Sequence, residues 1–361
     1  MTTVGIIANP ASGKDIRRLI AQGSVFDNQE KVSIVRRVIL GLQAAGVDHV
    51  VFMPDYFGIG KRAVDGIQLK LETSTLDMRM EANQDDSTRA AQMMHAMGVG
   101  AIITLGGDGT NRAVAKTIQD VPVMAISTGT NNVFPQMVEG TVAGLAAGIV
   151  AKRRLPLEET TFRQLRLEVL LDGEMIDLAL VDAVVYVDTF IGSRAVWDMS
   201  KVREIVMTRA SPSNIGLSSI GGSLHCAQLD RKHGVYVRLS EGQGPLELTA
   251  PIAPGLVETV HIAAYQLLKV GDQVPVEHIP SILALDGERE VVVHPGNRVS
   301  LALSDRGPLL IDLDRTLKLA AEHGLHAKIE NHAYTPGACL LHSAGLCLNP
   351  PDQCLVEYRL P

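Results

Sequence analysis

The chain has 361 residues, of which 46% are hydrophobic and 20% charged, a balance typical of a globular protein long enough for two domains. Its formal net charge of −7 argues against a sequence-independent nucleic-acid binder, because such proteins need a basic face to replace phosphate counterions. A nucleotide site is compatible with this charge, since a few backbone amides and one or two cations suffice to bind phosphate.

The sequence shows no evident targeting or membrane signal. Its start has no basic segment, and a short apolar run ends at Asn9-Pro10, which does not fit a signal peptide. No apolar stretch reaches the roughly 20 residues that span a bilayer. The four cysteines form no CxxC pair, and the cysteines and histidines between residues 332 and 354 fit no tight zinc pattern. We therefore expect a cytoplasmic protein with reduced thiols and no metal site made by the protein alone, which contacts neither nucleic acid nor membrane.

Short β-branched runs alternate with helical patterns through the first part of the chain, which is typical of a parallel sheet with crossover helices. The expected strands cover 4–8, 48–53, 101–105 and 121–127. The expected helices cover 31–45, 87–94, 111–119 and 140–151. These elements predict an α/β domain over residues 1–155.

The pattern changes near Pro156, after which Gly, Pro and Asp separate strand patterns and helical periodicity is scarce. The expected strands cover 164–171, 176–187, 234–240, 245–249, 257–263, 281–285, 290–293 and 298–303. We therefore expect a β-rich second domain over residues 156–312. A helix at 314–323 begins a third segment, 313–361, which we expect to pack back on the first domain.

The most informative motif is Gly106-Gly107-Asp108-Gly109-Thr110, placed between an expected strand and an expected helix. Its glycines permit positive φ and a close approach of the backbone to a ligand, and the amides that start the helix can bind phosphate. Asp108 can accept the proton of an attacking hydroxyl or help to hold a metal, and Thr110 can donate to a phosphate oxygen. The motif also fits a plain strand-to-helix turn with an Asp N-cap, since short glycine motifs often match by chance.

Two further polar turns follow expected strands, at residues 9–14 (NPASGK) and 128–132 (TGTNN). Ligands of open α/β sheets bind beyond the carboxyl ends of the strands, so three such turns predict one shared phosphate site. The expected phosphate-binding residues are Asn9, Ser12, Gly13, Lys14, Gly106, Gly107, Gly109, Thr110, Asn111, Thr128, Gly129, Thr130 and Asn131. A near match to a P-loop at 8–15 lacks its first Gly and its Ser/Thr, and a dinucleotide-like match at 58–63 is detached from its strand, so we assign neither a cofactor.

These motifs, in this order, resemble the superfamily of NAD kinases and diacylglycerol-type lipid kinases. Residues 128–131 are closer to the lipid-kinase form of the third motif. Weaker counterparts in the second half cover 179–182, 211–214, 250–254 and 285–288. The length, the NPASGKD opening and the GGDGTNR turn are most similar to the acetoin-catabolism protein X group. The resemblance implies an α/β nucleotide-binding domain and a β-sandwich domain with the active site between them.

The resemblance also implies an activity: transfer of a phosphoryl group from ATP or another polyphosphate donor, with Mg²⁺, to a hydroxyl of NAD or of a small-molecule acceptor, with a link to acetoin catabolism. Asp108 is the expected general base, the role of the equivalent Asp in NAD kinases. Asp286 is the alternative suggested by lipid kinases, although Asp-Gly is also an ordinary hairpin turn. Asp182, Ser213 and Asn214 are expected on the acceptor side. A homo-oligomer is an expectation carried over from the family.

Two departures bear on the acceptor. Val181 stands where NAD kinases have an Asn that contacts the acceptor, and Asn214-Ile215-Gly216 replaces their Gly-Ser-Thr. Losing such polar contacts can change selectivity by orders of magnitude, so NAD is not favoured. A nucleotide-binding regulator without turnover and a lipid-kinase-like enzyme are the alternatives, although the sequence has no basic amphipathic helix for a membrane surface.

Overall fold

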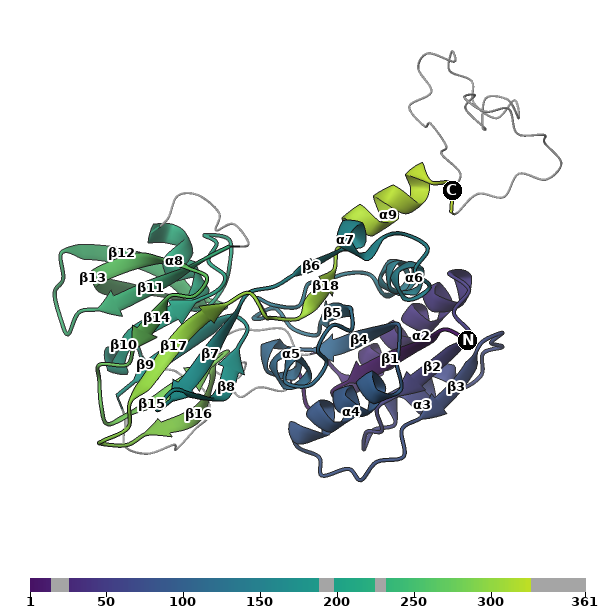
Figure 1. The fold of residues 1–361 in the computed structure, drawn as a ribbon, viewed down its shortest axis with the longest axis horizontal. Helices are drawn as coiled ribbons and strands as arrows, with labels where there is room; N and C mark the ends of the chain where they lie inside the picture. Colours follow the sequence, from purple (N-terminus) through teal and green to yellow (C-terminus); the bar gives the residue numbers. More distant parts are fainter. Residues whose placement is uncertain (14–25, 188–197, 225–231, 326–361) are drawn as a thin grey trace, which may run out of the picture.

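The computed structural model describes residues 1–13, 26–187, 198–224 and 232–325. An α/β domain and an all-β domain lie side by side, joined by extended segments of the chain (Figure 1). Lys14, the end of the chain beyond residue 325 and the cysteines and histidines expected not to bind zinc all lie outside the described residues. Within the described part, no helix is long and apolar enough to cross a bilayer.

The first domain is built on a seven-stranded sheet with the order β3-β2-β1-β4-β5-β18-β6. Its strands are β1 (Thr3–Ala8), β2 (His49–Phe52), β3 (Glu72–Thr75), β4 (Ala101–Gly106), β5 (Val123–Ser127), β18 (Leu309–Ile311) and β6 (Thr161–Arg163). All pairs are parallel except β18 with β6. The central strand β4 is buried along its whole length, as expected for a parallel sheet covered on both faces.

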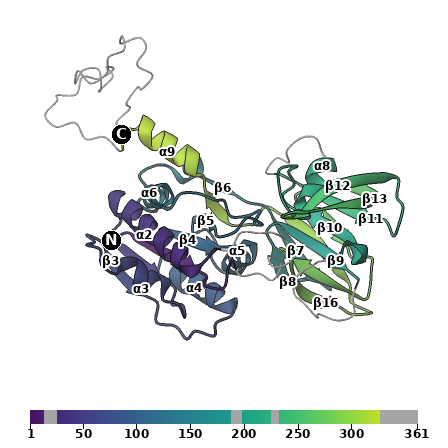
Figure 2. The ribbon, with the colours of Figure 1, turned by 180° about the vertical axis from the view of Figure 1, so that it is seen from behind.

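Helices cover both faces of this sheet (Figure 2). One layer contains α2 (Asn28–Ala44), α3 (Ile59–Val64) and α6 (Gly140–Ala151), and the other contains α4 (Asp85–Ala96) and α5 (Asp108–Ala115). The small residues of α6 let it pack closely on α2: a Cβ added at Gly144 would lie 2.1 Å from the carbonyl oxygen of Val38. The short α7 (Leu157–Thr160) and α9 (Leu313–Glu322) pack beside α6.

The second domain consists of two antiparallel sheets, with the orders β12-β13-β11-β10-β9-β15-β16 and β14-β17-β7-β8. Its strands are β7 (Arg166–Leu171), β8 (Glu174–Ala179), β9 (Asp182–Tyr186), β10 (Val202–Met207), β11 (His233–Leu239), β12 (Leu246–Ala253), β13 (Leu256–Lys269), β14 (Gln273–Pro275), β15 (Ser281–Leu285), β16 (Glu288–Val293) and β17 (Val299–Ser304). Along β9, Ala183 and Val185 enter the core between the sheets, while Val184 and Tyr186 face the core beneath α8 (Ser218–Leu224). This alternation is what a strand with two buried faces requires.

The expected fold class, an α/β domain followed by a β-rich domain of antiparallel sheets, is confirmed. One feature differs from the sequence pattern. The short strands β6 and β18 lie within residues 156–312 but extend the first sheet. The chain therefore leaves the first sheet after β6, forms the second domain, and returns to the first sheet at β18. Both strands have only three residues, too few to show a period.

Candidate functional site

The site lies at the topological switch point of the first sheet. Strands β2 and β3 lie on one side of β1, and β4 and β5 lie on the other, so the turns after β1 and β4 diverge. The side-chain amide of Asn9 donates to Thr110 Oγ1 across this point at 2.9 Å. Such a divergence opens a crevice beyond the strand ends, which is where open α/β sheets bind ligands.

All three polar turns of the sequence meet at this crevice. The hydroxyls of Ser12 and Thr128 are 2.9 Å apart, and the Thr128 amide donates to the Gly106 carbonyl oxygen at 3.2 Å. Gly13 adopts φ +80° and a Cβ added to it would lie 3.0 Å from the Thr128 carbonyl oxygen, so this position suits glycine. The turns are thus tied to one another before any ligand is present.

The glycine turn after β4 is shaped by close approach rather than by positive φ. Gly107 has φ −99°, which any residue can adopt. A Cβ added at Gly106 would lie 2.5 Å from Thr110 Cβ, because the Thr110 side chain folds back over the strand end. The expectation that positive φ requires a glycine is therefore wrong for Gly107. Glycine fits this turn because a larger residue would collide with neighbouring side chains.

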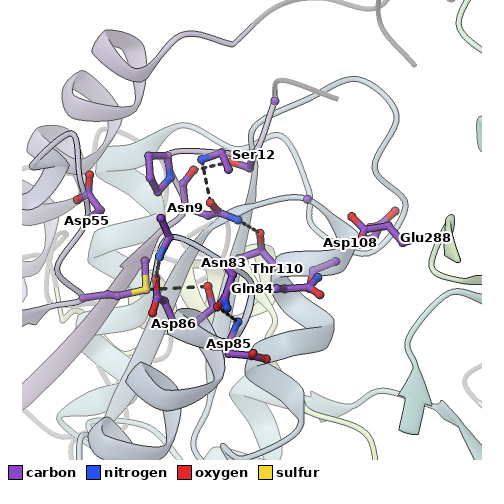
Figure 3. A pocket seen from close by; sticks show the side chains of 18 of the residues that line it. Asn9, Ser12, Asp55, Asn83, Gln84, Asp85, Asp86, Asp108, Thr110 and Glu288 are labelled. Atoms are coloured by element: carbon purple, nitrogen blue, oxygen red, sulfur yellow. Dashed lines mark hydrogen bonds between the residues drawn. The ribbon is translucent and has the colours of Figure 1, made fainter. Parts of the chain in front are cut away.

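A cleft of about 740 Å³ opens from these turns toward the second domain (Figure 3). Its volume falls within the range of roughly 300–1,000 Å³ that small-molecule sites occupy. The expected site residues that border it are Asn9, Ser12, Gly13, Gly107, Asp108, Gly109, Thr110, Asn131 and Asp286. The remaining expected turn residues lie behind this surface or beside it: Gly106, Asn111, Thr128, Gly129 and Thr130. Asn111, for example, is buried, where it accepts from Thr104 Oγ1 and donates to the Gly107 carbonyl oxygen.

Six carboxylates border the cleft: Asp55, Asp85, Asp86, Asp108, Asp286 and Glu288. Most of them are engaged by backbone amides. Asp55 accepts from the amides of Phe57 and Ile59 at the start of α3, and burial raises the pKa of Asp55. Asp86 accepts from the amides of Glu81 and Ala82. These carboxylates therefore fix the cleft wall as well as giving it negative charge.

Asp108, the first residue of α5, holds the loop that follows β5. Its carboxylate accepts from the amide of Val133 at 3.1 Å and from the amide of Phe134 at 2.8 Å. Charged acceptors of this kind make stronger hydrogen bonds than neutral ones. The carboxylate thus sits at the cleft surface in a fixed orientation.

Asp286 comes from the second domain, at the hairpin between β15 and β16. It adopts φ +52°, and its carboxylate accepts from the amides of Leu180, Val181 and Asp182 at 2.7–3.2 Å. Burial raises the pKa of Asp286 to about 7. The nearby Arg112 and these amides oppose the rise, and the charge of Asp108 reinforces it. This carboxyl can therefore exchange a proton near neutral pH.

A smaller cavity of about 80 Å³ continues from the cleft between the two domains. Asp108, Asn131, Asp286 and Gly287 border both spaces. Asp182, which the sequence predicts on the acceptor side, borders the smaller one. Ser213 and Asn214 border neither; Ser213 is exposed, and the next residues, 215–217, line the cavity instead.

Comparisons with known proteins agree with both halves of this architecture. Residues 4–154 match the ATP-NAD kinase N-terminal domain, and residues 165–306 match the acetoin catabolism protein X C-terminal domain. The acetoin catabolism protein X of Cupriavidus necator is 39% identical over 334 residues, which cover 89% of this chain and 93% of that protein. The chain belongs to the acetoin catabolism protein X family. The resemblance noted in the sequence is thereby confirmed.

A solved structure, yeast NADH kinase in complex with NADH, has the same fold as this family member. It aligns with a TM-score of 0.50 over 92% of this chain and 90% of that one, at 14% sequence identity. At this identity the likeness concerns the fold alone.

Arg209, which follows β10, is a residue of this family member that sequence reasoning did not single out. Its guanidinium donates to the carbonyl oxygens of Val133 and Phe134 at 3.0 and 3.2 Å, and to Gln164 Oε1 at 2.8 Å. It also lies over the Phe134 ring, 4.9 Å from its centroid. Val133 and Phe134, whose amides donate to Asp108, are thus also held through their carbonyl oxygens by a side chain of the second domain.

For the kinase proposed below, we expect Arg209→Lys to lower kcat about tenfold while nucleotide affinity changes little, because a displaced Val133–Phe134 segment misplaces Asp108. Lysine keeps the positive charge but cannot make the forked contacts of the guanidinium. Arg298→Lys is the matched control, since Arg298 is 86% exposed and pairs only with the exposed Asp172 in the contacts described. Equal kcat in the Arg209→Lys variant and the wild type would contradict this positioning role.

Lys31 is a second functional residue that the sequence did not reveal, because a lysine in an amphipathic helix ordinarily faces solvent. It is fully buried in α2, and its ammonium donates to the carbonyl oxygens of Asn9 and Ser12 at 2.9 and 2.6 Å. It also donates to Pro10 O and Asn28 Oδ1. This single side chain therefore holds the first polar turn in shape.

Lys31→Met should lower the free energy of unfolding by about 3 kcal/mol or more, since each buried acceptor left without a donor costs about 1–3 kcal/mol. Urea denaturation measures this directly. Lys318→Met serves as the control, because Lys318 is 76% exposed. A variant as stable as the control would show that the carbonyl oxygens find other donors.

Proposed function

We propose that this chain is a kinase that transfers the γ-phosphoryl group of ATP to a hydroxyl of a small-molecule acceptor, in the setting of acetoin catabolism that its relative's name indicates. One observation carries the proposal above all. Two carboxylates from different domains, Asp108 and Asp286, border both the large cleft and the small cavity that continues from it. A donor in the first space and an acceptor in the second would meet at these carboxylates.

The donor phosphates would lie against the turn after β1 and the start of α5, whose backbone amides favour anions. The described wall of the cleft carries six carboxylates, so a cation would offset their repulsion of a bound polyphosphate. The oxygen-rich wall suits Mg²⁺, which usually takes one or two carboxylates together with substrate phosphates. In the described part of the chain, no group of three His, Cys, Asp or Glu is arranged to hold a metal by itself.

Asp85, the first residue of α4, borders the cleft and would hold Mg²⁺ together with the nucleotide phosphates. When bound, the cation would offset charge on the phosphates, the main requirement of phosphoryl transfer.

Asp286 is our preferred general base, and Asp108 is the second choice. The sequence alone favoured the opposite order, but burial raises the pKa of Asp286 to about 7, close to the working range of a base. The acceptor oxygen would form the new bond to the γ-phosphorus as the bond to the β–γ bridging oxygen breaks. The hydroxyl proton would pass to Asp286, and ADP would leave.

A nucleotide-binding regulator is the second candidate. The observation that favours it is the engagement of Asp108 and Asp286 by backbone amides, which gives both carboxylates a structural role as well. Purified chain with ATP, Mg²⁺ and a panel of hydroxyl compounds, followed by phosphorus NMR, separates the two. The kinase forms a phosphate ester; tight nucleotide binding without a product from any acceptor would favour the regulator.

A further inference from the structure

Apolar atoms make up slightly more than half of the wall of the smaller cavity. Its apolar lining residues come mainly from the second domain: Val133, Val181, Met199, Ile215, Leu217, Ile252, Ala253 and Leu256. Val181 stands where NAD kinases have an Asn, and its side chain carries only methyl groups. The backbone amide of Val181 donates to the carboxylate of Asp286. An occupant of this cavity would therefore contact aliphatic carbon on one part of its surface and polar groups on the other.

The cavity is small. At about 80 Å³ it has roughly one ninth of the volume of the adjoining cleft. Since one water needs about 10–15 Å³ of such space, the cavity has room for roughly five to eight non-hydrogen atoms. A short-chain diol or hydroxyketone fits within that volume, whereas a nicotinamide riboside unit or an acyl glycerol would extend beyond it into the adjoining cleft.

The polar part of the wall is acidic. Asp108, Asp182 and Asp286 contribute carboxyl groups, and no lysine, arginine or histidine is among the described lining residues. An acceptor that carries a phosphate or carboxylate would meet like charges at short range in a poorly hydrated space, which costs several kcal/mol in comparable interfaces. A neutral hydroxyl compound would meet acceptors for its own hydroxyl hydrogens.

We propose, on the basis of the kinase function above, that the acceptor is a neutral alcohol of about three to five carbons with an apolar end. Its reacting hydroxyl points to Asp286, and its carbon chain lies against Ile215, Ile252 and Leu256. The reaction forms a bond from this hydroxyl oxygen to the γ-phosphorus of ATP, breaks the bond to the β–γ bridging oxygen, and gives the proton to Asp286. The products are a phosphomonoester and ADP.

Matched acceptors test the charge and size of the cavity. The full chain with ATP and Mg²⁺ is offered glycerol against glycerate, 2,3-butanediol and acetoin against 3-hydroxybutyrate, and NAD. We expect kcat/KM for glycerol to exceed that for glycerate at least tenfold, and kcat/KM for 2,3-butanediol and acetoin to exceed that for 3-hydroxybutyrate at least tenfold. The kcat/KM for NAD should lie below those of the neutral and the anionic compounds. Phosphorylation of NAD or of the anions in preference to neutral compounds would overturn the acceptor proposal and leave the kinase function standing. Absence of any ester would refute the kinase function itself.

A pocket variant separates recognition from stability. Leu256→Ala should raise kcat/KM for six-carbon diols relative to four-carbon diols by roughly tenfold, because removed methylenes in an apolar pocket are worth 10–200-fold. Val257→Ala, its neighbour on the same strand, is 60% exposed and lies outside the cavity, so it should leave the ratio unchanged. Ile252→Val provides a milder change if Leu256→Ala fails to fold. An unchanged ratio in both pocket variants would overturn the assignment.

Discussion

Asp286→Asn is expected to lower kcat by about 10²–10⁴-fold, the range typical of removing a general base. Asparagine is nearly isosteric and tolerates the left-handed backbone that this position adopts at φ +52°. One side-chain oxygen remains to accept from the amides of residues 180–182, so the hairpin should persist. Initial rates with the best acceptor at saturating ATP measure the loss.

The pH dependence gives the same prediction a second readout. The ionised form of Asp286 is the one that accepts a proton, and burial raises its pKa to about 7. Wild-type kcat should therefore rise with pH and level off above about 7, and Asp286→Asn should remove this inflection from its residual rate. A wild-type profile that is flat between pH 5 and 8 would contradict the assignment, since roughly that window contains the predicted titration.

The raised pKa of Asp286 should also make the free energy of unfolding depend on pH. Between its ordinary pKa of 3.8 and about 7, Asp286 holds a proton in the folded chain that the unfolded chain has released. The native state then binds more protons, so this residue's contribution to the free energy of unfolding falls as pH rises through that window. The fall should be absent in Asp286→Asn.

The chain provides a close control for this substitution. Asp172-Gly173 forms another hairpin turn with φ +51° and +92°, almost the backbone of Asp286-Gly287 at +52° and +82°. Asp172 is about half exposed, pairs with Arg298, and borders neither the cleft nor the cavity. Asp172→Asn should leave kcat and its pH profile unchanged, which separates the chemistry of Asp286 from the requirements of the turn.

Asp108→Asn is expected to lower kcat by about 10²-fold while ATP still binds. The amides of Val133 and Phe134 would lose their charged acceptor, and a shift of reacting groups by about 1 Å can cost that much. The charge of Asp108 also raises the pKa of Asp286, so its removal should move the pH inflection to a lower value. Steady-state rates across pH, with nucleotide binding measured by calorimetry, test both effects.

The outcome distinguishes the two carboxylates. If Asp108 were the base, its Asn variant would lose the pH inflection altogether, and Asp286→Asn would keep it. If Asp286 is the base, the pH profile of Asp108→Asn keeps its inflection but at a lower pH, and its maximal rate is lower than that of the wild type. The control for loss of loop structure is Arg209→Lys, which disturbs the same two residues, Val133 and Phe134, without removing a carboxylate.

Much of the fold could be predicted from the sequence because its elements have strong periods. The helix expected at 140–151 is α6, and the strand expected at 281–285 is β15. The strand expected at 176–187 is two strands, β8 and β9, separated at Leu180-Val181. Hydrophobic runs cannot show such a break, because both residues are buried in either arrangement.

The site was only partly predictable. Asn9, Thr110 and Asp108 could be placed because polar turns at the carboxyl ends of buried parallel strands are typical of ligand sites. Lys31 and Arg209 could not, because their partners are backbone carbonyl oxygens from distant turns, and carbonyl groups leave no trace in a residue pattern. The order of Asp108 and Asp286 also needed the structure, since burial and neighbouring charge decide which carboxyl has its pKa raised.

The most direct test of this account is transfer of the terminal phosphate itself. The purified chain is incubated with ATP radiolabelled at the γ-position, Mg²⁺ and a neutral four-carbon diol, and the label is followed into a phosphomonoester. We predict an ester that forms with wild-type protein, forms at least a hundredfold more slowly with Asp286→Asn, and forms normally with Asp172→Asn. Label released only as inorganic phosphate, or an ester formed equally fast by the Asp286→Asn variant, would contradict the account.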